Sequence, residues 1–214
     1  MELIQWFIDL VLHLDKHLVE LLMRFDVWIY AIVFLVVFAE TGLVVTPFLP
    51  GDSLLFALGA LAAIDTGGTL SAPWLALLLT AAAFLGDTVN YSVGRAIGHH
   101  AFSGRYRFIK PEYLRQTELY FDRHGSATIM LARFAPIIRT YAPFVAGVGH
   151  MRYSRFLAWN VLGAVLWVNL FIWAGYLFGN IPVIKNNFGF VTLAIIAISL
   201  TPMVVMFLRH RRGV

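Results

Sequence analysis

Four charged side chains interrupt segments that are otherwise apolar enough to be membrane: Glu40, Asp52, Arg133 and Arg139. An ionised side chain at the centre of a bilayer costs about 2.5–3.5 kcal/mol, so such residues usually face a partner or a water-filled cavity. A carboxyl group withdrawn from water is a candidate proton carrier, and the planar fork of arginine suits a phosphate or a carboxylate. These residue types therefore predict a hydrated site for transport of an anion, with Glu40 as the candidate proton carrier and both arginines binding substrate.

Each of these assignments has a structural alternative. Asp52 follows Gly51 and precedes Ser53, a position from which a carboxylate caps a helix and favours its positive end. The two arginines could instead be locked onto Glu40 and Asp52. Both interpretations can hold together, because an anionic substrate can displace a carboxylate from an arginine once that carboxylate is protonated.

The composition identifies a membrane protein. Of 214 residues, 60% are hydrophobic and 13% are charged, and the mean hydropathy is +0.77. A soluble domain of this length could not solvate that balance, and one integral membrane domain over 1–214 is the economical interpretation. The net charge of +4 comes from basic residues that flank apolar segments, so no nucleic-acid partner is expected. The sequence offers no cysteine, metal-ligand cluster or cofactor motif, and no enzyme activity is expected.

The first 64 residues predict a surface helix followed by a broken hairpin. Apolar residues recur every three or four positions over 1–26, which indicates an amphipathic helix at the membrane surface or against another subunit. Over 27–64, Pro47 and Pro50 forbid a continuous helix and Gly51 permits a reversal. The run from Ser53 to residue 64 is too short to span a bilayer alone, so we expect a helix and a re-entrant hairpin.

The middle of the chain predicts one transmembrane helix and one surface helix. Over 73–98, polar residues share a helical face that should point inward; they are Asp87, Asn90, Tyr91 and Gly94. The segment 99–124 is basic and amphipathic, with Pro111 near a helix start and Gly125 as a stop.

The remainder of the chain predicts a second broken hairpin and two spans. Residues 125–151 repeat the proline-interrupted pattern at Pro136, Thr140 and Pro143, and we expect a re-entrant hairpin there. The segments 153–184 and 187–208 contain long charge-free runs that can cross the bilayer. The spacings Gly94-x3-Gly98 and Gly175-x3-Gly179 permit close helix packing, either within one chain or between the subunits of a homodimer.

Basic residues set the expected orientation. Thirteen of the sixteen lysines and arginines would share one side, which places both termini in the cytoplasm. The two hairpins then enter from opposite sides. A shift of 96 residues matches Phe38-Ala39, Pro47-Phe48 and Gly51 with equivalents in the second half, so the fold class expected is an all-α inverted-repeat bundle with two opposed re-entrant hairpins.

At these positions the chain resembles the DedA family of bacterial inner-membrane proteins, which carry a VTT or SNARE-associated domain. The motifs that carry the resemblance are Glu40-Thr41-Gly42, Thr46-Pro47-Phe48-Leu49-Pro50-Gly51-Asp52-Ser53, Gly86-Asp87-x2-Asn90-Tyr91, Arg133-Phe134-x-Pro136-x2-Arg139-Thr140 and Ala146-Gly147. The resemblance implies paired re-entrant hairpins, dependence on the proton motive force and a role in envelope integrity. It also implies an acid pair and an arginine pair needed for activity, which here are Glu40 with Asp52, as the proton-coupling residues, and Arg133 with Arg139. Similar members return undecaprenyl phosphate to the cytoplasmic leaflet, and eukaryotic relatives move phospholipids.

The leading hypothesis is therefore proton-coupled translocation of a lipid phosphate, with lipid and protons as the partners. A proton-coupled transporter of small ions would use the same charges but would predict a sealed aqueous vestibule in place of openings toward lipid. A membrane assembly factor would predict that neutral substitutions disturb folding but no flux.

Overall fold

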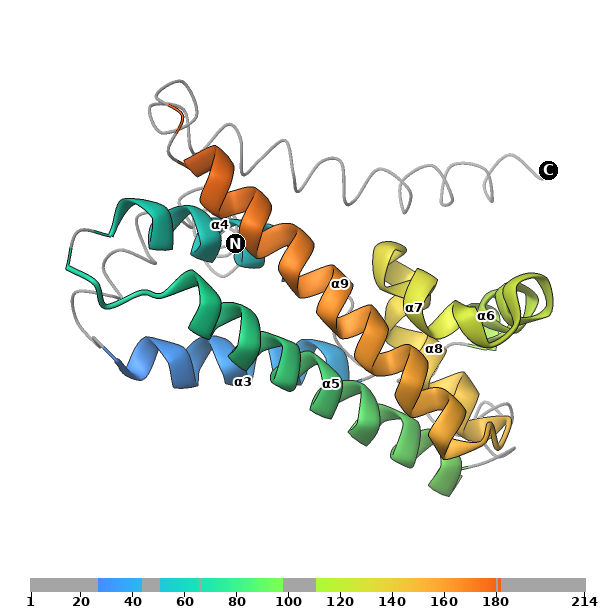
Figure 1. Cartoon of the computed structure of the whole chain (residues 1–214). Coiled ribbons are helices and arrows are strands. Elements are labelled where there is room, and N and C mark those ends of the chain that lie inside the picture. Colours follow the sequence, from blue (N-terminus) through green and yellow to red (C-terminus); the bar gives the residue numbers. More distant parts are fainter. Residues whose placement is uncertain (1–26, 44–50, 66, 98–110, 180, 182–214) are drawn as a thin grey trace, which may run out of the picture. The chain divides into compact units, whose positions relative to one another are not determined.

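The computed structural model describes residues 27–43, 51–65, 67–97, 111–179 and 181 (Figure 1). No strand occurs among them, which confirms the all-α prediction for the described part of the chain. The helical elements, labelled as in Figure 1, are α3 Trp28–Gly42, α4 Gly51–Ile64, α5 Ala72–Ile97, α6 Pro111–His124, η2 Gly125–Ala127, α7 Thr128–Leu131, η3 Ala132–Phe134, α8 Pro136–Val148 and α9 Tyr153–Gly179. The predicted segments 1–26 and 187–208, the hairpin tip with Pro47 and Pro50, and residues 99–110 lie outside the described residues.

Two of the described helices are long and apolar enough to cross a membrane. Helix α5 has 26 residues and α9 has 27, so each is about 40 Å long, against a hydrocarbon core of about 30 Å. The expected spans were 73–98 and 153–184, and the second helix ends earlier, at Gly179. Helices α3 and α4, with 15 and 14 residues, are too short to cross unaided.

The chain divides into two compact units. The first comprises Met1–Phe34, Pro50–Leu79 and Val168–Thr201, and the second comprises Leu35–Leu49, Thr80–Trp167 and Pro202–Val214. Helices α3, α5 and α9 therefore each contribute residues to both units.

The segment between α6 and α9 is broken at one proline. Helix α6 ends at His124, and Gly125 after it takes a left-handed φ of 59°. The sequence predicted this glycine as the end of the helix. Ala135 is extended, with φ −121° and ψ 105°, and Pro136 opens α8, because a residue before proline avoids helical geometry. Pro143 was also expected to break the chain, and this expectation was wrong. It lies inside α8, where the fully buried Ala142 and Phe144 on either side favour the helix despite the hydrogen bond that proline cannot donate.

In the first unit, the half-helix α4 packs on α9 through glycines. A Cβ on Gly59 would lie 2.1 Å from the carbonyl oxygen of Ile172, and one on Gly175 would lie 2.0 Å from that of Phe56. Only glycine admits such close backbone contact.

In the second unit, α8 packs on α5 in the same manner. A Cβ on Gly94 would lie 2.2 Å from the carbonyl oxygen of Phe144, and one on Gly147 would lie 2.1 Å from that of Tyr91. Phe144 and Gly147 follow Phe56 and Gly59 by 88 residues, while Ile172 and Gly175 follow Tyr91 and Gly94 by 81. Each half-helix thus makes the same paired contacts with the long helix of the other half of the chain. These contacts follow a register other than the expected 96 residues.

Candidate functional site: two buried arginine–carboxylate pairs

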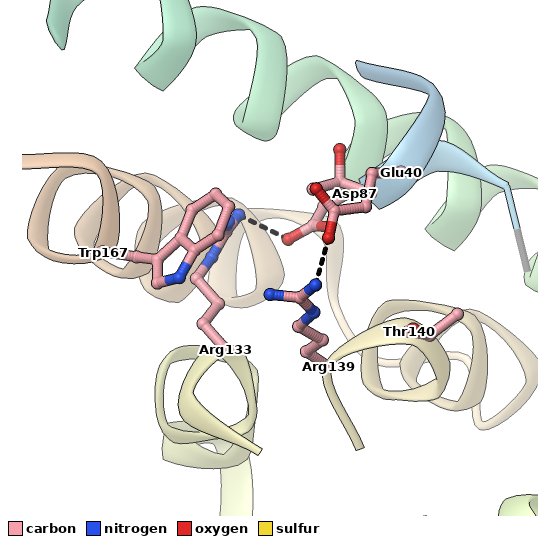
Figure 2. A pocket seen from close by; sticks show the side chains of 7 residues that line it. Glu40, Asp87, Arg133, Arg139, Thr140 and Trp167 are labelled. Carbon is pink, nitrogen blue, oxygen red and sulfur yellow. Dashed lines mark hydrogen bonds and ion pairs between the residues drawn. The ribbon is translucent and has the colours of Figure 1, made fainter. Parts of the chain in front are cut away.

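Two arginines and two carboxylates meet within the second unit (Figure 2). Arg133 Nη2 donates to Asp87 Oδ2 over 2.5 Å, and Arg139 Nη2 pairs with Glu40 Oε1. The Arg133 and Asp87 side chains are each 5% exposed, whereas Arg139 is 13% exposed and Glu40 3%. The charges balance inside the cluster, which is the condition under which ionised groups tolerate burial.

Four different elements supply these side chains. Glu40 is on α3 and Asp87 on α5, while Arg133 is in η3 and Arg139 in the second turn of α8. The break at Ala135 separates the two arginines, and both guanidinium groups still turn toward the carboxylates in Figure 2. The local sequence makes this arrangement possible, because a continuous helix would place residues six positions apart on different faces.

Close packing between α3 and α5 brings the two carboxylates near each other. A Cβ on Gly86 would lie 1.9 Å from Thr41 Oγ1 and 2.8 Å from the carbonyl oxygen of Phe38. Asn90, one turn further along α5, donates from Nδ2 to the Thr41 carbonyl at 3.2 Å and to the Thr140 carbonyl at 2.9 Å. Asn90 therefore ties α3 and α8 to the same face of α5.

The structure gives Arg133 a partner that the sequence did not indicate. The structural alternative was a lock of the two arginines onto Glu40 and Asp52. Arg139 does pair with Glu40, but the partner of Arg133 is Asp87, which was predicted as a supporting residue. Asp52 lies in the first turn of α4, a place where a carboxylate favours the helix dipole, and it belongs to the first unit. The polar face predicted for 73–98 indicated that Asp87 points inward, but no sequence spacing indicated that it pairs with Arg133.

The other predicted supporting residues lie at different places in the fold. Thr140 lines the pocket, and Asn90 and Tyr91 are buried on the inward face expected for α5, where Tyr91 Oη donates to the Met151 carbonyl at 2.5 Å. Gly51 and Ser53 begin α4 in the first unit, and Pro136 begins α8. Pro143 is buried within α8, and Pro47 and Pro50 lie outside the described residues.

Two site residues on α9 were not predicted. Arg133 Nη2 also donates to Asn160 Oδ1 at 2.7 Å, and the Trp167 ring lies 5.9 Å from Arg133 Cζ and 5.6 Å from Arg139 Cζ. Both residues are buried. The available signal was a polar asparagine inside a charge-free transmembrane run, which is a functional-site indication in its own right.

The pocket in the second unit is small and is lined by Glu40, Thr41, Asp87, Arg133, Arg139, Thr140 and Trp167. Its volume is about 10 Å³, room for about one water molecule and not for a phosphate group. This pocket is therefore smaller than the hydrated site expected from the sequence, and its lining would have to move before a phosphate could enter it. Among the described residues, no three histidine or acidic side chains converge as metal ligands.

Comparison with known proteins shows the family. Residues 49–177 match the VTT domain family, and the chain is 51% identical over all its 214 residues to Protein DedA of Escherichia coli K12, covering 97% of that protein. This chain belongs to the DedA family. The resemblance inferred from the motifs is thereby confirmed, and this chain is a membrane protein of that family.

More distant members of the family are also similar. Membrane protein Rv0364 of Mycobacterium tuberculosis H37Rv is 42% identical over 186 residues, which cover 85% of this chain and 79% of that protein. Inner membrane protein YqjA of Escherichia coli K12 is 35% identical over 156 residues, covering 72% and 70%. These names support an inner-membrane location for the DedA-family protein. No solved structure matches.

Proposed function

We propose that this DedA-family protein translocates a lipid phosphate between the leaflets of the bacterial inner membrane, coupled to protons. Undecaprenyl phosphate is the leading substrate, on the strength of the resemblance described above. The phosphate would bind the arginines while the polyprenyl chain stays in lipid. No bond is made or broken, so the protein acts as a transporter and no enzyme activity or cofactor is proposed.

The observation that carries the proposal is the buried pairing of Arg139 with Glu40 and of Arg133 with Asp87. Arginine stays charged at any physiological pH, so an emptied partner position must be filled by another anion. When a carboxylate takes up a proton, it loses its negative charge, and the arginine beside it can then bind another anion. Arg139 is the more exposed arginine, and its pair with Glu40 is the one we assign to headgroup exchange. The proposal also includes a role in proton coupling for Asp52, which belongs to the first unit.

The membrane arrangement of the proposal is an inverted repeat. The matching glycine contacts of α4 on α9 and of α8 on α5 support it, as does the short length of both half-helices. In this arrangement the two half-helices would enter the bilayer from opposite sides, with both termini cytoplasmic and the substrate site near the midplane.

The test is lipid translocation in liposomes. Purified wild-type protein, Arg139→Ala, Arg133→Ala and the control Arg152→Ala would be reconstituted with a polyprenyl phosphate, and the lipid exposed at the outer leaflet would be followed over time. Arg152 is exposed and lies in the α8–α9 connection. We expect both site variants to lose at least about tenfold in rate and the control to lose little. Folded site variants with wild-type rates would contradict the proposal. So would a wild type that moves no lipid, a result that favours an assembly factor or a carrier of small ions.

A further inference from the structure

We propose that one face of α9, formed by Asn160, Gly163 and Trp167, is an uncharged cradle that holds the site arginines in place while their carboxylate partners change. These residues are spaced three and four apart, so they lie on one helical face over about two turns. The role assigned to the cradle rests on the proposed function, because it matters only if the ion pairs open.

Asn160 forms one end of the cradle. It is fully buried, and its Oδ1 accepts from Arg133 Nη2 at 2.7 Å. Its Nδ2 donates to the Phe84 carbonyl at 3.1 Å and lies 3.5 Å from Thr88 Oγ1. These two contacts fix the amide with its oxygen toward the guanidinium. Because α5 carries both Phe84 and Asp87, Asn160 holds Arg133 beside its acid without using a charge of its own.

Gly163 forms the floor of the cradle. A Cβ at this position would lie 3.0 Å from both Cδ and Nε of Arg133 and 3.1 Å from the Met130 Cα. The absent side chain is therefore the space in which the stem of Arg133 runs. The nearest groups include the backbone of α7, so the stem has little freedom to move away.

Trp167 forms the other end and serves both arginines. Its ring face attracts guanidinium groups at 5.9 and 5.6 Å, and the side chain is 1% exposed. A cation–π contact gains strength when it is removed from water. The ring can thus hold Arg133 and Arg139 near one another, although their like charges repel, and present both to one anion (Figure 2).

The uncharged cradle gives the guanidinium groups contacts that do not depend on whether the carboxylates are ionised. If Asp87 leaves Arg133, the buried guanidinium loses the carboxylate with which it is paired, at a large cost, and loss of Glu40 removes a carboxylate from Arg139. Asn160 Oδ1 and the Trp167 face remain, since neither group titrates. The arginines therefore stay in position between the release of a carboxylate and the arrival of the headgroup.

Chemical labelling of the arginines tests the cradle directly. Purified protein would be treated with phenylglyoxal, which modifies accessible guanidinium groups, and the rates at Arg133 and Arg139 would be read by peptide mass spectrometry. In Asn160→Leu and in Gly163→Ala, we expect labelling of Arg133 to rise at least about fivefold, with Arg139 close to wild type. In Trp167→Leu we expect both rates to rise, and in Trp167→Phe neither. Asn160→Asp, which keeps an oxygen at the same place, should protect Arg133.

The matched controls are Asn169→Leu, on the same helix, and Gly149→Ala, where a Cβ would meet only the Val145 carbonyl at 3.3 Å. Both should label like wild type. Unchanged labelling of Arg133 in folded Asn160→Leu or Gly163→Ala would overturn the cradle, and so would a parallel rise at Arg139 in those variants. Because labelling needs no lipid, either result is independent of the flux measurements that test the proposed function.

Discussion

Arg133 and Asp87 form an ion pair between a 3₁₀ turn and a transmembrane helix, 46 residues apart in sequence and 2.5 Å apart in space. The pair is almost fully buried, and Asn160 shares the same guanidinium nitrogen. Removing one member of a buried pair leaves the other as an uncompensated buried charge, and this lowers the stability of the protein far more than replacing both members by apolar residues. The stability of the site therefore depends on matched charges more than on either residue alone.

Substitution of Asp87 by alanine should destabilise the protein by about 3–5 kcal/mol, because Arg133 then keeps its charge without a carboxylate. Thermal unfolding in detergent would measure the loss. The double variant Asp87→Leu with Arg133→Met should recover most of it while remaining inactive in flux. The exposed Asp122→Ala on α6 is the control and should change little. A double variant no more stable than Asp87→Ala would contradict the ion-pair account.

Replacement of Glu40 by glutamine should strengthen headgroup binding at neutral pH. Glutamine imitates the protonated acid, so Arg139 becomes available to the phosphate, whereas in the wild type the Glu40 carboxylate competes for it. Binding of a polyprenyl phosphate to purified wild type and Glu40→Gln at one pH would test this, because the phosphate titrates at about pH 6 and affects both proteins alike. Equal affinities for the two proteins at pH 7 would remove Glu40 from the coupling mechanism.

The glycines at the α4–α9 and α5–α8 contacts should tolerate no side chain. Gly175→Ala and Gly94→Ala each place a carbon about 2 Å from a backbone carbonyl oxygen, and we expect a loss of about 1–3 kcal/mol or more in each. The two losses should be similar, because the contacts correspond. Gly149→Ala provides the matched control, and unfolding by denaturant is the measurement. A stable Gly94→Ala beside an unfolded Gly175→Ala would argue against equivalent packing in the two units.

Asp65, in the connection between α4 and α5, should stabilise the protein at neutral pH but not in acid. The Leu70 N–H donates to Oδ2 at 2.7 Å and the Gly67 N–H to Oδ1 at 2.9 Å, and these bonds hold the pKa of Asp65 below its ordinary value. The group's contribution is present above the unfolded-state pKa of about 3.9 and is lost as the pH falls through the lower folded-state pKa. Melting curves of wild type and Asp65→Asn should therefore differ at pH 7 and approach one another as the pH falls below the unfolded-state pKa. A difference that stays constant with pH would exclude this role.

Sequence alone predicted the long helices, because α5 and α9 carry apolar runs whose length is set by bilayer thickness. It also singled out Glu40, Arg133 and Arg139, since a charge in such a run is costly, and the structure brings these three residues into one ion-paired cluster. The pairing of Arg133 with Asp87 and the part played by Trp167 depend on which helices meet, and no local period encodes that. Pro143 shows the same limit, because burial of its neighbours outweighs the local preference of proline to end a helix.

The space beside Glu40 and Asp87 has room for about one water molecule. Protons move between water molecules that touch one another, and a single water has no second water to pass a proton to. Within this pocket, a proton would therefore have to be handed to a side chain of the ion-paired cluster.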